Sequence, residues 1–340
     1  MQRRRPSVGV LSGDSADVYF RRAEEILAKE GLDPVVVMEV FSRREGILAG
    51  LDEAKVLLAH VLHDAGEEDA VVESLADGDA FGSKEVVLRI RARYRAFGLY
   101  ETAILGMLAQ STGWAMAARE CVVAANPAPV ISFGARHVHP HITDTLDYAA
   151  IVGGCVGAST PAGARLAGLS PTGTMPHSLV LVVGDTVRAA EAFDRHVAPD
   201  VPRIVLVDTF KDEAEEALRV AEALGERLYG VRLDTPSERG RVTAELVSEV
   251  RARLDLAGHD HVKLIVSGGL TPDRIEYFKQ AESPVDFYAV GSYISGASPV
   301  DFTGDLKEID GRPVAKRGRI PGLTASPRLV PLDLQEWLPS

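Results

Sequence analysis

The chain has 340 residues, of which 46% are hydrophobic and 25% are charged, and its formal net charge is −12. This length suggests about two domains, and the acidic balance argues against nonspecific nucleic-acid binding. Two cysteines, Cys121 and Cys155, cannot build a disulfide framework, and no Cys/His spacing is typical of a zinc site. No apolar run reaches the roughly 18 residues of a membrane span. The sequence therefore predicts a globular cytoplasmic protein with no nucleic-acid or membrane partner.

The first 128 residues are expected to form an α+β domain. Apolar residues at helical spacing predict helices over residues 17–29, 51–62 and 99–119. Strand-like runs cover residues 34–41 and 85–94, and the second of these alternates apolar with basic side chains. Near residue 129 the pattern changes to short apolar runs that alternate with helical segments.

Residues 129–302 are expected to form an α/β barrel. Seven short apolar runs alternate here with helical segments, including helices expected over 212–224 and 236–254. The runs are PVISFGARH, CVGAST, SPTGTM, RIVLVDTF, YGVRLD, VKLIVSGG and DFYAVGSY. Such alternation implies parallel strands with crossover helices, and the number of runs favours a closed or nearly closed barrel over an open sheet. Functional side chains are then expected at the carboxyl ends of the strands.

Two glycine-containing turns at consecutive strand ends are candidate phosphate-binding segments. One is Ser267-Gly268-Gly269, which a helix pattern follows, and the other is Gly291-Ser292. Glycines allow close approach of a backbone to a ligand, and a helix amino terminus offers free N–H groups to an anion. The alternative is that these glycines only form tight turns. Their placement on adjacent strands favours a phosphate site.

Two aspartates each end an apolar run and are candidate catalytic residues. Asp208, followed by Thr209, ends one run, and Asp234 ends the next. Either aspartate alone could simply cap a helix. Together they can face one ligand, where they would hold ribose hydroxyls or a divalent cation or stabilise a developing positive charge. Arg232 alternates with Asp234 and so shares its strand face, where an arginine needs a carboxylate or an anionic ligand.

Three groups of histidine and basic residues are further candidates for the site. His177 follows Thr174 in the GTMPHS turn and is either a structural or a functional residue. The HVHPH run at residues 137–141 is a poor metal site, because a proline interrupts it and no carboxylate accompanies it. Arg136 lies near Phe133 in sequence, which offers a cation beside an aromatic ring for a flat anionic ligand. The basic clusters at 42–46 and 316–319 are either solvated surface or a site for a highly charged anion.

Ordered segments of the chain are similar to the nicotinate phosphoribosyltransferase family, in its shorter archaeal-type branch. The similar segments are EVFSRREGILAGLDE, GLYETAILGMLA, SFGARH, GTMPHS, LVDTF, GVRLD, SGGLTPDRI, AVGSYI and GRPVAKRG. They occur in the family's order from about residue 10 to 320. The resemblance implies the type II phosphoribosyltransferase fold: an irregular α/β barrel, an amino-terminal α+β domain over residues 1–128, and a segment over 303–340 that returns to that domain.

The resemblance also implies a reaction and partners. Family members join nicotinate to phosphoribosyl diphosphate with Mg²⁺, giving nicotinate mononucleotide and diphosphate. Many couple this to ATP hydrolysis through phosphorylation of a histidine, which matches His177. Family dimers complete each site with residues of the partner, and Tyr19, Arg43 and Arg44 match that contribution. The chain departs from the family pattern at Ser132, where an aspartate is usual, and at residues 235–237.

The residues and the resemblance lead to one expected site. Asp208 and Asp234 stabilise the ribosyl cation, with His177 as the third catalytic residue. Expected substrate contacts are Tyr19, Phe133, Arg136, Thr174, Thr209 and Arg232; phosphate contacts are Ser267, Gly268, Gly269, Gly291 and Ser292; diphosphate contacts are Arg43, Arg44 and Lys316. The alternatives are a quinolinate or nicotinamide phosphoribosyltransferase and a noncatalytic phosphosugar- or nucleotide-sensing barrel. The presence together of Asp208, Asp234, Arg232 and His177 favours an enzyme, because a binding protein has no need of all four.

Overall fold

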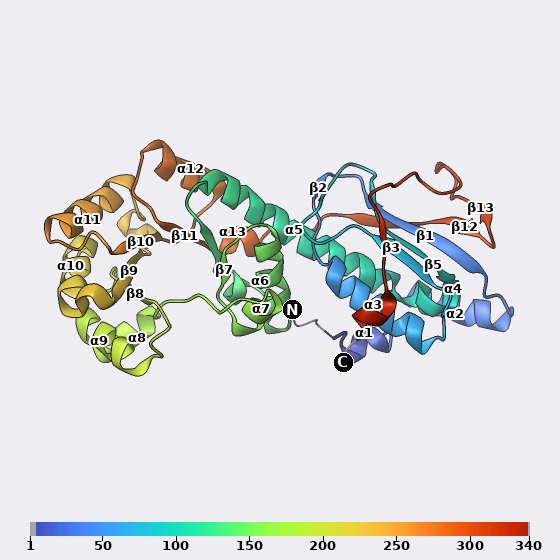
Figure 1. Cartoon of the computed structure of the whole chain (residues 1–340), viewed down its shortest axis with the longest axis horizontal. Coiled ribbons are helices and arrows are strands. Elements are labelled where there is room, and N and C mark those ends of the chain that lie inside the picture. The colour runs from blue at the N-terminus through green and yellow to red at the C-terminus, as the bar shows by residue number, and fades with distance from the viewer. Residues whose placement is uncertain (1–4, 339–340) are drawn as a thin grey trace. The chain divides into compact units, whose positions relative to one another are not determined.

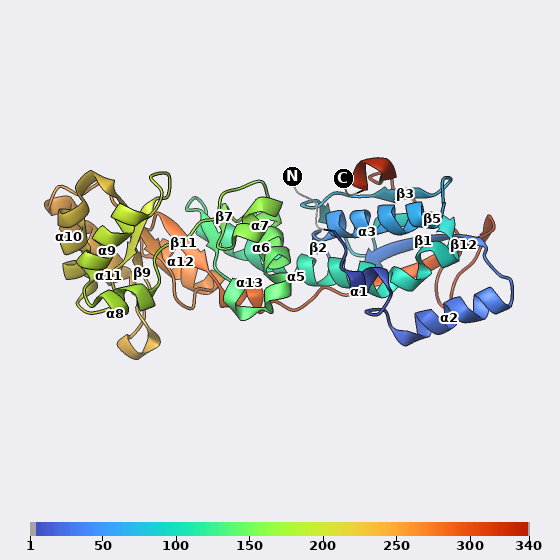
Figure 2. The same ribbon diagram turned by 90° about the horizontal axis from the view of Figure 1, so that it is seen from below.

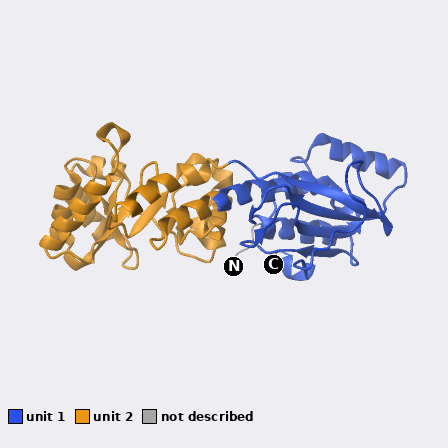
Figure 3. Cartoon of the chain, turned by 90° about the horizontal axis from the view of Figure 1, so that it is seen from above, with its two compact units in different colours: residues 1–116, 298–340 blue, residues 117–297 orange. Residues whose placement is uncertain are grey.

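The computed structural model describes residues 5–338, and these form two compact units (Figure 3). The first unit contains the residues up to Met116 together with those from Ser298 onward, and the second contains Ala117–Ala297. The sequence places its boundaries after residues 128 and 302 instead. Helix α5, Glu101–Ala125, runs through the first of the observed boundaries.

The first unit is built on an antiparallel sheet in the order β13-β12-β1-β5-β3-β14. Its strands are β1 (Val35–Ser42), β3 (Val71–Ser74), β5 (Val86–Arg93), β12 (Phe302–Ile309), β13 (Arg312–Pro313) and β14 (Val330–Pro331), with β2 (Gly46–Ile47) paired to β4 (Ala80–Phe81). Its helices are α1 (Val8–Leu11), α2 (Val18–Lys29), α3 (Leu51–Asp64), α4 (Tyr94–Phe97) and the first part of α5. Within residues 5–338 the structure contains no helix that is both long and apolar enough to cross a bilayer.

Helix α3 supplies much of the core of this unit. Its apolar residues, such as Leu57 and Leu58, are fully buried against Met38 of β1 and Leu88 of β5. Figure 2 shows α3 lying along this sheet. The helices and strands predicted before residue 129 are confirmed, with ends shifted by a few residues. Strand β12 pairs with β1 and β14 pairs with β3, so the segment after residue 302 returns to this sheet.

The second unit is an α/β structure with an all-parallel sheet in the order β7-β6-β11-β10-β9-β8 (Figure 1). The strands are β6 (Val130–Ser132), β7 (Gly157–Ala158), β8 (Arg203–Leu206), β9 (Leu228–Leu233), β10 (Lys263–Val266) and β11 (Phe287–Val290). The helices are α6 (Thr143–Val152), α7 (Pro161–Leu166), α8 (His177–Val183), α9 (Thr186–His196), α10 (Glu213–Leu224), α11 (Ala244–Leu256), α12 (Pro272–Gln280) and α13 (Ser292–Ser295). Helix α9 packs against β8 and α10 against β9.

One of the seven predicted strands is absent from this sheet. The SPTGTM run forms no regular structure, because Pro171, Gly173 and Pro176 do not suit a hydrogen-bonded ladder. It lies between β7 and β8, which are the two edges of the sheet. The prediction of a strand here is therefore wrong, and the sheet is a half-barrel that stays open at this point. The α/β class and the amino-terminal α+β domain are confirmed.

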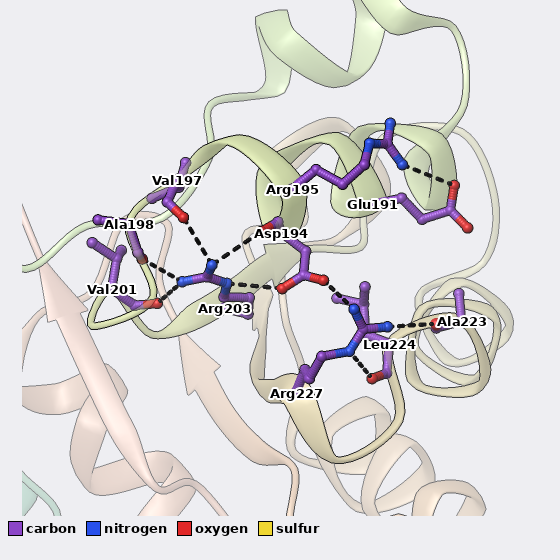
Figure 4. A network of polar contacts seen from close by, with 10 residues as sticks. All are labelled: Glu191, Asp194, Arg195, Val197, Ala198, Val201, Arg203, Ala223, Leu224 and Arg227. Carbon is purple, nitrogen blue, oxygen red and sulfur yellow. Dashed lines mark hydrogen bonds and ion pairs between the residues drawn. The ribbon is translucent and has the colours of Figure 1, made fainter.

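A buried arginine fixes the start of β8. Arg203 donates to Asp194 and to backbone carbonyls of residues 194, 197, 198 and 201 at the end of α9 (Figure 4). Arg227 bonds to the same Asp194 carboxylate. The bond to the Asp194 carbonyl satisfies a group in the last turn of α9, and the other carbonyl bonds hold the loop that follows the helix. The network therefore anchors the amino end of β8, whose other end leads to Asp208.

Candidate active site

A cavity of about 430 Å³ lies where the strands of the half-barrel end. Since the strands are parallel, the residues that follow β6, β9, β10 and β11 meet on the side of the sheet where the strands have their carboxyl ends. The lining residues are Phe133, Ala135, Arg136, His137, Ser159, Gly173, Thr174, Met175, Pro176, Arg232, Asp234, Ser267, Gly268, Gly269, Ala289, Gly291 and Ser292. Ten of the residues selected from the sequence are among them.

Asp234 is held in the cavity wall by two donors. Its Oδ2 accepts from Arg232 Nη2 at 2.9 Å, and its Oδ1 accepts from Ser267 Oγ at 2.8 Å. Arg232 also donates through Nη1 to Thr174 Oγ1 at 2.8 Å. The side chains of Arg232 and Asp234 are 12% and 24% exposed, so this pair is largely removed from water. The carboxylate is thus fixed in position with one side facing the cavity.

The cation over the aromatic ring differs from the one predicted. The Arg232 guanidinium carbon lies 5.8 Å from the centre of the Phe133 ring. Arg136 lines the same cavity but is exposed, in the short turn Ala135–His137. Arg136 is close to Phe133 in the sequence, but the arrangement of the strands places the Arg232 side chain over the Phe133 ring instead. The predicted contact is therefore wrong, and Arg136 is left to face the cavity.

His177 and Asp208 form a hydrogen-bonded pair. His177 Nε2 lies 3.0 Å and 3.1 Å from the two oxygens of Asp208. The Asp208 side chain is 3% exposed and that of His177 is 37% exposed. The bond to Asp208 raises the pKa of His177 above its usual value, although partial burial opposes this shift. With Nε2 bonded to Asp208, the ring nitrogen that remains for chemistry is Nδ1.

The glycine turns have the properties that an anion site needs. Gly268 and Gly269 have φ values of +89° and +63°, which favour glycine over other residues. Their amide groups, and that of Leu270, have no hydrogen-bond acceptor among residues 5–338. A Cβ on Gly291 would lie 3.0 Å from the carbonyl oxygen of Phe133, so a side chain there would crowd the backbone after β6. The backbone at both turns is therefore open toward the cavity.

The remaining predicted residues lie elsewhere. Thr209 follows Asp208, and its buried hydroxyl oxygen has no hydrogen-bond partner in the described part of the chain. Tyr19, Arg43, Arg44 and Lys316 are exposed residues of the first unit. Tyr19 donates to Asp17 at 3.1 Å. Their assignment to the substrate site stays a prediction.

Sequence reasoning missed a buried carboxylate next to the cavity. Asp147 of α6 accepts from Ser132 Oγ at 3.1 Å and from Thr160 at its backbone N–H (3.0 Å) and hydroxyl (2.7 Å). It therefore ties the ends of β6 and β7 together, and burial raises its pKa. The residue at 132 is thus a serine that donates to a carboxylate on a neighbouring helix. Nothing in the local sequence around Asp147 signals this contact.

A second omission concerns the segment after β9. The predicted helix over 236–254 is wrong in its first eight residues, because α11 begins at Ala244 with Thr243 as its cap. The preceding residues form a loop with one short turn, Ser237–Arg239. Pro236 and Gly240 are the signals that could have shown this break. The loop brings Arg241 to Gly269, a contact that the predicted helix concealed.

Solved structures share this fold. A nicotinate-nucleotide pyrophosphorylase from Pyrococcus furiosus is 42% identical, with a TM-score of 0.83 over 95% of this chain and 82% of that one. The human nicotinic acid phosphoribosyltransferase shares the fold at 18% identity, with a TM-score of 0.68 over 90% of this chain and 77% of that one. Together with the half-barrel and the separate α+β sheet, these matches define the type II phosphoribosyltransferase fold.

Sequence comparisons identify the family. Models of the N-terminal and C-terminal domains of quinolinate phosphoribosyl transferase match residues 17–112 and 114–305. The chain belongs to this family. Two nicotinate phosphoribosyltransferases of Mycobacterium tuberculosis are 31% and 33% identical, over 72% and 63% of this chain. These matches cover 55% and 46% of those proteins, so the chain spans about half the length of these curated relatives.

Proposed function

We propose that the chain transfers the phosphoribosyl group of phosphoribosyl diphosphate to nicotinate. The observation that carries this proposal is the fixed Asp234 carboxylate beside a glycine turn with free amides, in one cavity. A phosphosugar has an anionic end for the amides and a ribose that develops positive charge on reaction. The cavity offers a matching group for each end. The Mycobacterium relatives, which carry the name nicotinate phosphoribosyltransferase, support the same substrate.

The reaction forms a bond from the pyridine nitrogen to the anomeric carbon and breaks the bond to diphosphate. The nitrogen lone pair is free, so no general base is required. As the leaving group departs, the ribose gains oxocarbenium character, which a nearby fixed carboxylate stabilises. Asp234 is the carboxylate at the cavity wall, and Asp208 holds His177 beside it. The protein contributes position and charge rather than covalent chemistry.

Mg²⁺ would support the departure of diphosphate. This ion is commonly held by one or two carboxylates together with substrate phosphates, because it releases its water reluctantly. Asp234, which is a quarter exposed, fits that part. The proposed diphosphate contacts are the exposed cations Arg43, Arg44 and Lys316. The proposed contact to the pyridine ring is Tyr19. In a homodimer, one subunit would contribute such residues to the site of the other. Mg²⁺ bound with the substrate would neutralise the developing charge on the leaving group.

The number of cations available in the cavity favours nicotinate. Arg232 is bonded to Asp234 and Thr174, which leaves Arg136 to pair with one ring carboxylate. A second carboxylate would be desolvated without a firm partner, and such burial costs several kcal/mol. Quinolinate is the second candidate, because the matching family models carry its name. His137 near Ser295 Oγ, at 3.1 Å, is the side chain that would have to serve its extra carboxylate.

ATP coupling would proceed through His177. The nitrogen at Nδ1 would attack the γ-phosphate while Asp208 holds Nε2–H, and ADP would leave. Wild-type protein incubated with γ-labelled ATP should retain acid-labile, base-stable label. His177→Ala should retain none. An active wild type without label would restrict His177 to contacting substrate.

The test of the proposed function is direct product formation. Purified chain is incubated with phosphoribosyl diphosphate and Mg²⁺, with nicotinate, nicotinamide or quinolinate in separate reactions. Mass spectrometry should detect the mononucleotide of nicotinate in the first reaction and little product in the others. Product from quinolinate alone would support the second candidate. Binding of phosphoribosyl diphosphate without product from any pyridine would support a sensing role instead.

A further inference from the structure

The loop between β9 and α11 carries an arginine with an unusual backbone. Residues 235–243 follow Asp234, which lines the cavity. Arg241 in this loop has a φ of +68°, a left-handed conformation that residues with a side chain rarely adopt. Its guanidinium is exposed and has no hydrogen bond or ion pair within residues 5–338. Unfavourable backbone conformations are retained where the surrounding structure enforces them, often at functional sites.

The loop is fixed at both ends, so the backbone position of Arg241 is enforced. Four bonds hold it: Thr235 Oγ1 to Glu213 Oε1 (2.7 Å), Arg241 N to Pro236 O (3.1 Å), Arg274 Nη2 to Val242 O (2.8 Å) and Ala244 N to Tyr277 Oη (3.2 Å). Glu213 is buried at the start of α10, while Arg274 and Tyr277 belong to α12. The loop is therefore built against two helices rather than left free in solvent.

Arg241 lies against the glycine turn. A Cβ at Gly269 would be 2.9 Å from Arg241 Nη1, so the guanidinium lies close to this part of the backbone. The free amides of Gly268 and Gly269 supply dipoles but no full positive charge. Of the other cations, Arg232 is neutralised by Asp234 and Arg136 follows β6. Arg241 is therefore a cation that the fold places at the turn and that no carboxylate within residues 5–338 neutralises.

We propose that Arg241 binds the 5-phosphate of the phosphoribosyl substrate, together with the amides of Gly268 and Gly269. This inference rests on the proposed function and adds a specific cation to its phosphate site. A guanidinium pairs with phosphate through two parallel hydrogen bonds and carries a full positive charge, which amides do not. The pairing explains why an arginine occupies a position whose backbone favours glycine.

The test compares wild type with Arg241→Gly by calorimetry. Ribose 5-phosphate should bind at least ~10-fold more weakly to the variant, as expected for loss of a charge-assisted hydrogen bond. Inorganic diphosphate should bind equally to both proteins. The melting temperature should stay the same or rise, because glycine relieves the left-handed backbone. Glu282→Gly, at a φ of +51° in the same unit, gives the same relief without loss of the cation.

Each outcome separates this inference from the proposed function. Equal ribose 5-phosphate affinity in wild type and Arg241→Gly would overturn the assignment of Arg241 alone. A fall in both affinities with a lower melting temperature would assign Arg241 a structural role and overturn it too. A wild type that binds no ribose 5-phosphate and no phosphoribosyl diphosphate would overturn the proposed function, and this inference with it.

Discussion

Asp234→Asn is the substitution that most directly perturbs the proposed chemistry. The variant keeps the size of the side chain but removes the charge that faces Arg232 at 2.9 Å. An exposed ion pair contributes about 0–1 kcal/mol, whereas breaking a buried pair costs about 3–5 kcal/mol. With its partners 12% and 24% exposed, this pair lies between those limits, at about 2 kcal/mol.

The effect on catalysis should exceed the effect on folding. Loss of the carboxylate that stabilises the ribosyl cation should lower kcat by at least ~10²-fold, or about 2.7 kcal/mol of transition-state stabilisation. A loss of about 2 kcal/mol in a unit of this size lowers the melting temperature by roughly 4–8 °C. The folded variant therefore remains available for assay at moderate temperature.

Asp286→Asn is the matched control. Asp286 pairs with Lys263 at 3.1 Å and accepts from the Leu264 amide, at the amino ends of β10 and β11. It is a carboxylate of the same unit, but it lies at the amino ends of the strands, away from the cavity at their carboxyl ends. Its replacement should leave kcat within about twofold of wild type, since a pair this exposed contributes little. Steady-state kinetics and melting curves on both variants compare the loss of kcat with the loss of stability. Near-normal turnover in Asp234→Asn would refute the role of this carboxylate.

Substitutions at Gly269, His177 and Arg136 test the phosphate, histidine and pyridine contacts separately. Gly269→Val should weaken the binding of phosphoribosyl diphosphate measured by calorimetry. The control Gly168→Val has a similarly strained φ of +72° and no close contact, so it should bind the substrate as wild type does. Equal affinity in the two variants would mean that Gly269 only forms a turn. Because the pKa of His177 is raised, the bond to Asp208 should stabilise wild type relative to His177→Gln below about pH 6.5, and melting curves should show this advantage shrinking as pH rises; a pH-independent difference would contradict it. Arg136→Ala should lose most of an expected ~10²-fold kcat/KM preference for nicotinate over nicotinamide, and an unchanged preference would place the pyridine elsewhere.

Strand-end residues could be predicted because parallel topology leaves them few alternatives. Asp234, Ser267 and Gly291 each follow an apolar run, and parallel strands must bring such positions to one edge. Sequence alternation also placed Arg232 on the inner face with Asp234, as the 2.9 Å bond between them shows. Local pattern and simple topology were sufficient for this part of the site.

Contacts made by loops and by sheet curvature could not be predicted in this way. Arg241 lies near Gly269 in a loop that the apolar pattern predicts as helix, although Pro236 and Gly240 interrupt this pattern. The stacking of Arg232 over Phe133 depends on the twist between strands far apart in sequence. The open edge of the half-barrel also depends on the pairing of distant segments. Such features require the three-dimensional arrangement of the unit.

We propose that this cavity joins a pyridine monocarboxylate to a phosphoribosyl group. The most direct measurement is the initial rate with nicotinate and with quinolinate, at equal phosphoribosyl diphosphate and Mg²⁺, read as mononucleotide by mass spectrometry. We expect nicotinate-dependent product, with kcat/KM at least ~10²-fold above that for quinolinate. A faster reaction with quinolinate, or no product from either substrate, would contradict it.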